Sequence, residues 1–172
     1  YGENPHQAAA VYDFSLSQTG LNKMIQHNGK ALSYNNLIDC EAAWHIVREF
    51  DEPAVAIIKH TNPCGVAIAN TLSLAYTKAL ESDPVSAFGG IIGCNQIVDD
   101  AVADKISNLF VEVVVAPGFS SGAIDILSQK PSLRLIELPD FFDRESSFVL
   151  KHIQGGMLLQ QPDHLVFDSN NL

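Results

Sequence analysis

Short, uninterrupted apolar segments constrain the fold of this 172-residue chain more than any other feature. Ala54–Ile58 and Val113–Ala116 contain no polar side chain. A strand that is apolar on both faces is normally covered on both faces, as the strands of parallel sheets are. The same segments are far too short to span a bilayer. We therefore expect a buried sheet with helices on both sides, and no membrane partner.

Segments with helical periodicity alternate with these apolar runs. We expect strands at 23–27, 54–59, 90–98, 111–116 and 133–138, and helices at 36–50, 71–81, 99–109 and 123–129. Asn36 and Asp99 are the expected N-caps of the first and third helices. Residues 148–154 and 157–161 flank a Gly-Gly pair and predict a closing hairpin. The pattern predicts one α/β domain over residues 1–172, with a mostly parallel sheet and its site beyond the carboxyl ends of the strands.

Composition excludes several classes of protein. With 20 acidic and 10 basic residues, the formal net charge is −10, which argues against a protein that binds a nucleic-acid backbone. The cysteines Cys40, Cys64 and Cys94 are too far apart in sequence for a C-x-x-C pair, so we expect neither a disulfide framework nor a zinc cluster. A reducing cytoplasm is the simplest location. Because Tyr1 is not a methionine, we expect a piece of a longer protein.

Lys59–Gly65 is the segment richest in chemistry. Lys59 and His60 follow the buried strand, where a lysine is costly unless it meets negative charge, and histidine suits a general base near neutral pH. Neighbours in a regular strand point to opposite faces, so both can reach one ligand only if the pleat breaks. We expect that break at Asn62-Pro63 and Gly65. The alternative interpretation is a capped strand with a surface lysine and a helix-capping histidine.

Two further segments combine turn-forming and functional residue types. Asp83–Gly90 predicts a tight turn in which Gly89 and Gly90 accommodate positive φ angles; alternatively its backbone cradles a ligand, with Phe88 as a wall or stacking residue. Tyr1–Gln7 predicts an irregular arm.

Together with Glu112–Gly118, these three segments resemble the transformylase part of the bifunctional AICAR transformylase / IMP cyclohydrolase family. The resemblance covers all 172 residues but only the first part of that domain. It implies a three-layer α/β/α fold similar to cytidine deaminase. It also implies that a preceding cyclohydrolase domain and the later transformylase half lie outside this chain.

The resemblance implies formyl transfer from 10-formyltetrahydrofolate, as co-substrate, to the 5-amino group of AICAR in purine (IMP) biosynthesis, by a homodimer in the full protein. By match to the family, His60 accepts the proton and Lys59 stabilises charge on the formyl oxygen. An arginine expected just before Tyr1 is not in this chain, and some relatives carry Asp where Glu112 stands. The expected substrate-binding residues are Tyr1, Asn36, Phe88, Gly89 and Glu112.

Three alternatives remain. The chain could be a non-catalytic nucleotide-binding or assembly module. A zinc nucleoside deaminase would need H-x-E and P-C-x-x-C; the chain has Pro63-Cys64 without the second cysteine and no H-x-E, so we expect no metal. A generic nucleotide-binding α/β domain would need a glycine-rich loop such as G-x-G-x-x-G, which the sequence lacks.

Overall fold

The computed structural model describes residues 1–12, 21–138, 148–161 and 163. The chain divides into two compact units, Tyr1–Phe142 and Asp143–Leu172. The elements of the first unit are the 3-10 helix η1 (Leu21–Lys23), β1 (Ile25–Asn28), α1 (Tyr34–Val47), β2 (Ala54–Lys59), β3 (Asn62–Ile68), α2 (Leu72–Ser82), β4 (Ile91–Cys94), α3 (Asp100–Ser107), β5 (Val113–Ala116), α4 (Ser121–Leu127) and β6 (Arg134–Glu137). The second unit contains β7 (Val149–Ile153) and β8 (Gly156–Gln160).

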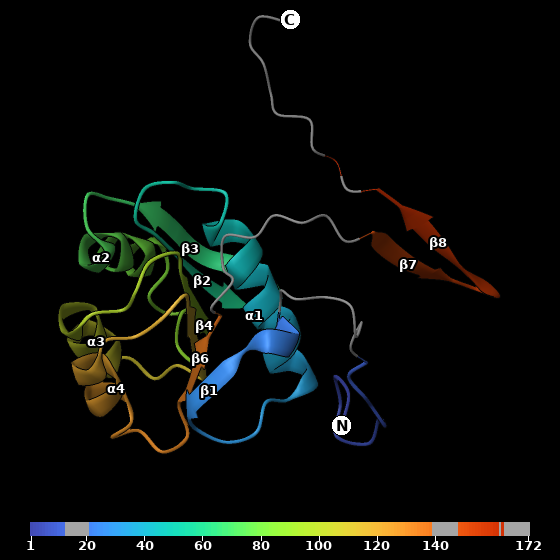
Figure 1. Cartoon of the computed structure of the whole chain (residues 1–172), viewed down its shortest axis with the longest axis horizontal. Helices are drawn as coiled ribbons and strands as arrows, with labels where there is room; N and C mark the ends of the chain where they lie inside the picture. The colour runs from blue at the N-terminus through green and yellow to red at the C-terminus, as the bar shows by residue number, and fades with distance from the viewer. Residues whose placement is uncertain (13–20, 139–147, 162, 164–172) are drawn as a thin grey trace, which may run out of the picture. The chain divides into compact units, whose positions relative to one another are not determined.

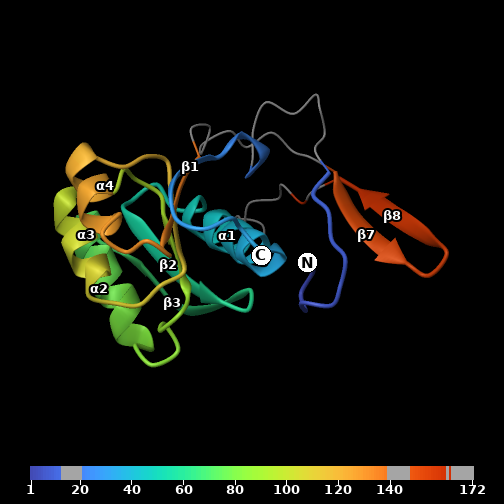
Figure 2. The same ribbon diagram turned by 90° about the horizontal axis from the view of Figure 1, so that it is seen from below.

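Six strands of the first unit form one mixed sheet in the order β1-β6-β5-β4-β2-β3. Strands β4, β5 and β6 are parallel, whereas β1 runs antiparallel to β6, β2 to β4, and β3 to β2. Helix α1 covers one face of the sheet, and α2, α3 and α4 cover the other (Figures 1 and 2). The predicted three-layer α/β/α fold is confirmed.

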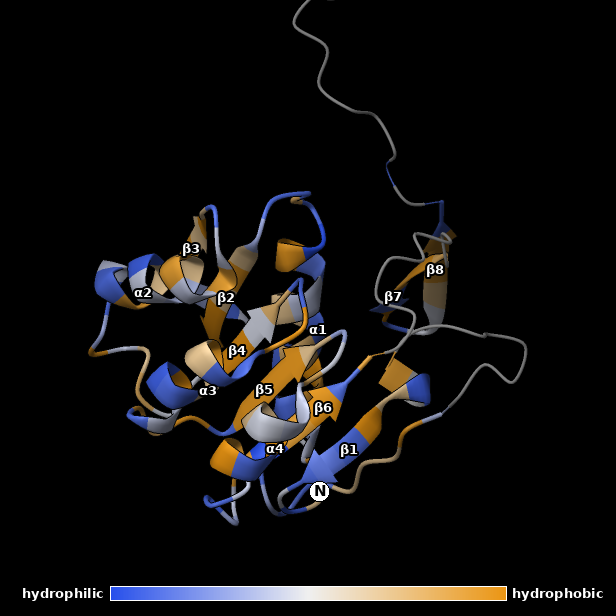
Figure 3. Ribbon diagram, turned by 60° about the vertical axis from the view of Figure 1, so that its left-hand side comes forward, coloured by the Kyte–Doolittle hydropathy of each residue, from blue (hydrophilic) through white to orange (hydrophobic). Residues whose placement is uncertain are grey.

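The alternation of side chains along the strands divides the core between the two faces. In β5, Val113 and Val115 pack with α1, whereas Val114 and Ala116 pack with the helices on the other face. All four side chains are fully buried. Figure 3 shows β5 and β6 in hydrophobic colours, in contrast to the polar end of the edge strand β1. The central strands are therefore apolar along their whole length because each face of the sheet packs against a helix layer.

One strand, β3, was not expected from the sequence. Pro63 and Gly65 suggested a loop, but β3 is an edge strand, where proline is tolerated, and the pairing with β2 shifts by one residue between Ile57 and Ile58. Gly65 is required by packing, because a Cβ at this position would collide with the Ala79 carbonyl of α2. The β2–β3 hairpin places Lys59 beside the amino end of β4, since Ile58 pairs with Ile91.

The helix starts follow side-chain caps. The prediction that Asn36 caps α1 is wrong: Ser33 is the N-cap, and Asn36 occupies the third helical position of a reciprocal capping box. Ser33 itself was the signal in the sequence, because serine is one of the preferred N-cap residues. Asp99 caps α3 as predicted, and Thr71 and Ser120 cap α2 and α4.

The second unit contains the predicted hairpin. Strands β7 and β8 pair antiparallel, with Ile153 opposite Gly156 and a positive φ at Gly155. In the part of the chain that the structure describes, no helix combines the length and apolar character that a membrane crossing requires.

Candidate functional site

The candidate residues gather at the amino ends of the parallel strands, not beyond their carboxyl ends as the alternating pattern predicted. Phe88 and Gly89 precede β4, and Glu112 precedes β5. Lys59 reaches the same edge because β2 runs antiparallel to β4. Backbone hydrogen bonds join these loops: Gly89 N donates to Phe110 O at 2.8 Å, and Glu112 N donates to Gly90 O at 3.0 Å.

Lys59 is the last residue of β2 and is half-buried. Its Nζ donates a hydrogen bond to the carbonyl oxygen of Phe88 at 2.9 Å. This bond places the ammonium beside Gly89, whose φ of 76° confirms the positive φ predicted there, whereas the positive φ predicted for Gly90 is wrong. An ammonium has three donors, so Lys59 retains hydrogen-bonding capacity for a ligand.

His60 lies in the tight turn between β2 and β3. The chain reverses at His60 and Thr61, whose φ angles are 52° and 62°. The residues expected to break the strand, Asn62-Pro63 and Gly65, belong to β3; the pairing with β2 shifts between Pro63 and Gly65, but the chain reversal lies before them, at His60-Thr61. A two-residue turn of this kind has positive φ at both positions, and this conformation strains residues that carry a Cβ, such as His60 and Thr61. His60 is exposed at this reversal.

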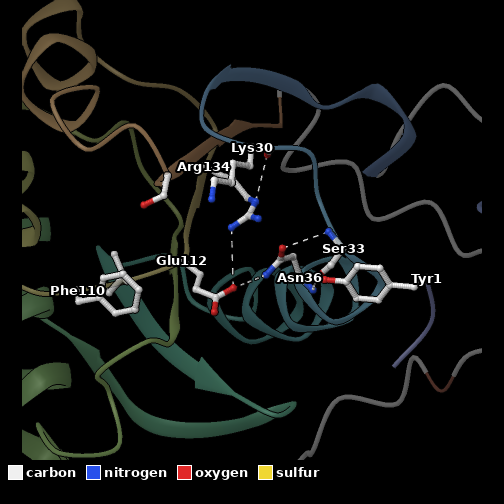
Figure 4. A pocket seen from close by; sticks show the side chains of 9 residues that line it. Tyr1, Lys30, Ser33, Asn36, Phe110, Glu112 and Arg134 are labelled. Carbon is white, nitrogen blue, oxygen red and sulfur yellow. Dashed lines mark hydrogen bonds and ion pairs between the residues drawn. The ribbon is translucent and has the colours of Figure 1, made fainter. Parts of the chain in front are cut away.

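A cavity of about 300 Å³ opens at the same edge (Figure 4). Its lining includes three predicted residues, Tyr1, Asn36 and Glu112. Phe88 and Gly89 adjoin it through Phe110: the two phenyl rings lie 5.1 Å apart, and Gly89 bonds to the Phe110 carbonyl. Neither Lys59 nor His60 lines it. The lining residues are Tyr1, Lys30, Ser33, Asn36, Phe110, Val111, Glu112, Ser132 and Arg134.

Glu112 is held on one side by one hydrogen bond and one ion pair. Asn36 Nδ2 donates to Glu112 Oε2 at 2.9 Å, and Arg134 Nη1 lies 3.9 Å from the same oxygen (Figure 4). Arg134 is fixed in turn, since its Nε lies 3.2 Å from the carbonyl oxygens of Lys30 and Ala31. The side chain of Glu112 remains 46% exposed, against 14% for Arg134. The carboxylate therefore has an oxygen, Oε1, for which the described residues show no hydrogen bond.

The amino-terminal arm is folded locally. Gly2 N donates to Gln7 O at 2.8 Å, and Asn4 N donates to the Gln7 side chain at 2.7 Å. Asn35 of α1 donates to the Glu3 carbonyl at 3.2 Å, which connects the arm to the first turn of α1. The Tyr1 side chain projects toward the cavity beside Ser33 and Asn36 (Figure 4).

Several site residues were missed from the sequence. Arg134 could have been found, because a charged residue that opens an apolar strand is rarely buried without a partner. Phe110 and Lys30 have no distinctive local signal, since an aromatic residue and a lysine beside turns are common. Asp39, which accepts hydrogen bonds from the His60 turn, lies on a helix and resembles any surface acid.

The cysteines near this edge are poorly suited to nucleophilic roles. Burial, reinforced by the Asp83 carboxylate and opposed by Lys59, raises the pKa of the Cys64 thiol. Burial likewise raises the pKa of Cys40 to about 12. A thiol with a raised pKa holds little thiolate at neutral pH. Among the described residues, no group of three or more His, Cys, Asp or Glu side chains is arranged to hold a metal ion.

Comparison with known proteins gives a match over the whole chain. The model of the AICARFT/IMPCHase bienzyme family matches residues 1–172. A protein named bifunctional purine biosynthesis protein PurH, from Thermoanaerobacter sp. (strain X514), is 47% identical over 172 residues, which are 100% of this chain and 34% of that protein. Its namesake from Lysinibacillus sphaericus (strain C3-41) is 48% identical over 168 residues, 97% of this chain and 33% of that protein. The chain thus spans about a third of the length of these relatives, and it belongs to the AICARFT/IMPCHase bienzyme family.

Proposed function

We propose that this chain is the first part of a transformylase domain that transfers a formyl group from 10-formyltetrahydrofolate to the 5-amino group of AICAR, a step of purine biosynthesis. Family membership and the names of the relatives support the proposal. One structural observation carries the proposal. Lys59, Gly89 and Glu112 come from separate segments of the sequence but lie together at the amino ends of the parallel strands, beside a cavity of about 300 Å³.

The cavity has the chemistry of a nucleotide site. Lys30 and Arg134 supply positive charge that suits a phosphate, and arginine can form paired hydrogen bonds with one. A carboxylate such as Glu112 suits the hydroxyl groups of a ribose. Phe88 and Phe110 are 57% and 49% exposed, so their rings offer apolar surface to a flat heterocycle.

The reaction assigns different tasks to the two residues at the end of β2. The amino nitrogen of AICAR forms a bond to the formyl carbon, and His60 accepts the proton that this nitrogen loses. Lys59 stabilises the negative charge on the formyl oxygen in the tetrahedral intermediate. When the intermediate collapses, the bond from the formyl carbon to N10 of the folate breaks, and the folate nitrogen takes up the proton that His60 accepted, which returns the imidazole to its neutral form. Formylated AICAR and tetrahydrofolate are the products.

Activity requires more than these residues. Because the chain spans about a third of its relatives, we propose that the rest of the folate surface comes from other parts of the full protein, which acts as a homodimer in the cytoplasm. The isolated chain should then bind AICAR without turning it over. Poor orientation of the formyl donor forfeits a proximity advantage that can reach ~7–11 kcal/mol.

The test is a formyl-transfer assay on the full-length gene product that contains this chain, followed by tetrahydrofolate formation. We expect turnover that depends on both AICAR and 10-formyltetrahydrofolate. AICAR binding without any transfer would reject catalysis and favour the alternative of a nucleotide-binding or assembly module. Absence of AICAR binding as well would reject the proposal altogether.

A further inference from the structure

We propose that Asp39 is a positioning residue, which clamps the strained turn at His60-Thr61 and thereby aims the His60 imidazole. This inference rests on the proposed function of His60. It assigns a role to a helical carboxylate that no motif in the sequence marks. Its basis is the hydrogen bonding and the backbone conformation of the turn.

Asp39 contacts the turn through both carboxylate oxygens. Its Oδ1 accepts a hydrogen bond from Thr61 N at 2.7 Å, and its Oδ2 accepts one from His60 N at 3.3 Å. Each amide thus has its own oxygen, an arrangement that a carboxylate can provide and a neutral amide side chain cannot. Hydrogen bonds to an ionised acceptor are stronger than those between neutral groups. The carboxylate therefore joins α1 to the reversal between β2 and β3.

The turn needs such a support because its residues fit it poorly. Turns with positive φ at both central positions favour Asn-Gly, whereas this one contains His60 and Thr61, at 52° and 62°. Positive φ is a genuine outlier for a β-branched residue such as threonine. Backbone strain of this kind persists only where the surroundings enforce it, and it is concentrated at functional sites.

Other hydrogen bonds hold the opposite side of the same peptide group. Thr61 Oγ1 and Asn62 Nδ2 both donate to the His60 carbonyl oxygen, at 2.7 and 2.8 Å. The peptide group between His60 and Thr61 is consequently held at its nitrogen, Thr61 N, by Asp39 and at its oxygen, the His60 carbonyl, by the Thr61 and Asn62 side chains. Lys59 is fixed at the same time by the Phe88 carbonyl. Hydrogen bonds thus hold the backbone at the proposed base and the side chain of the proposed oxyanion partner.

The experiment compares three variants of the full-length gene product in the formyl-transfer assay: Asp39→Asn, the double variant Asp39→Asn/Thr61→Gly, and the control Asp125→Asn. Asp125 is an exposed aspartate on another helix, α4. We expect Asp39→Asn to lower kcat by about 10²-fold with KM for AICAR nearly unchanged, because a small misplacement of a catalytic group has an effect of that size. The control should keep the parental kcat and KM.

Adding Thr61→Gly separates positioning from other roles. Glycine adopts positive φ without strain, so the double variant should recover about tenfold of the lost kcat even though it lacks the Thr61 hydroxyl. If Asp39 contacted substrate directly, Asp39→Asn would raise KM for AICAR and Thr61→Gly would restore nothing. Either of these results would overturn the proposal.

A spectroscopic measurement on the same proteins does not depend on activity. In Asp39→Asn, the Thr61 and His60 amides should exchange with solvent faster, and the imidazole resonances of His60 should shift; in Asp125→Asn they should not. If the parental protein transfers no formyl group, the proposed function fails, and these spectra still decide about Asp39. Unchanged amide exchange and unchanged imidazole resonances in Asp39→Asn would show that Asp39 does not position His60.

Discussion

The two ends of the parallel strands differ in how their polar groups are used. At the carboxyl ends, Asp99 caps α3, and Ser120 caps α4 while it donates to Asp100 Oδ1 at 2.6 Å. The buried Asn95 after β4 makes side-chain bonds to three backbone groups, at 2.7 to 2.9 Å. At the amino ends, the Glu112 side chain remains partly exposed beside a cavity, and Lys59 and His60 lie at a partly solvated turn.

We infer from this difference that strand direction, rather than the general rule for α/β sheets, decides where a site can form here. The flanking strands β1 and β2 are antiparallel to their parallel neighbours, so their carboxyl ends bring Lys30 and Lys59 to the amino ends of β4–β6. The opposite end uses its polar side chains to cap helices and to bind the backbone. We infer that the amino end carries the function and the carboxyl end carries stability.

The largest effect is expected from His60→Ala at the amino end. Loss of the proposed base should lower kcat by about 10²–10⁴-fold, or ~3–5 kcal/mol, with nucleotide binding largely kept. The measurement is steady-state formyl transfer by the full-length gene product. His45→Ala, an exposed histidine of α1, is the matched control and should keep normal turnover. More than half the parental turnover in His60→Ala would remove His60 from this role.

Lys59→Met should reduce turnover about as strongly, because the ammonium is needed for charge that develops only in the transition state. The methionine retains the length of the half-buried side chain, so folding should be affected less. Kinetics over a range of AICAR concentrations separates kcat from KM. A variant with intact kcat and a raised KM would make Lys59 a ground-state contact.

Asn95→Ala tests the carboxyl end. Removing this side chain leaves Ala54 N and the carbonyls of Phe50 and Glu52 without their bonds from Asn95, and should lower the free energy of unfolding by about 2–4 kcal/mol. Urea unfolding of this chain measures the loss. The folded variant should still bind AICAR with parental affinity. Weakened binding without a loss of stability would contradict the division between the two ends.

The smallest effect concerns pH and the turn that leads to the amino end of β4. Hydrogen bonds from the Ser86 side chain and backbone N–H hold the pKa of the partly exposed Asp83 below its ordinary value of 3.8. The resulting stabilisation is fully present above pH 3.8 and is lost as the pH falls through the lowered pKa. Melting temperatures between pH 2 and 6 should therefore show a small parental advantage over Asp83→Asn that vanishes at the acid end. If the difference in melting temperature persisted at the lowest pH, the lowered pKa of Asp83 would not be its cause.

Local patterns predicted the layers of this fold well. The bounds of β2 are those expected, Asp99 caps α3, and the hairpin lies on either side of Gly155. These features depend on hydrophobic runs, caps and turn residues, which are properties of neighbouring residues. The hidden strand β3 escaped because its proline and glycine are explained only by its edge position and by the close approach of α2.

The sequence motifs predicted the candidate site residues but not how these residues are arranged. The segments with Lys59-His60 and Phe88-Gly89 were found, yet the end of the sheet where they meet depends on strand directions that no local pattern encodes. The partnership of Asn36 and Arg134 with Glu112 joins residues far apart in sequence. The left-handed turn at His60 was also hidden, because its residue types do not favour it.

Mapping AICAR binding by NMR tests most directly whether the amino end carries the function. In a titration of the ¹⁵N-labelled chain, amide resonances of Asn36, Gly89 and Glu112 should move with AICAR concentration. Those of Asn95, Asp99 and Ser120 should stay in place. Shifts confined to the second group, at the carboxyl ends of β4 and β5, would contradict the account.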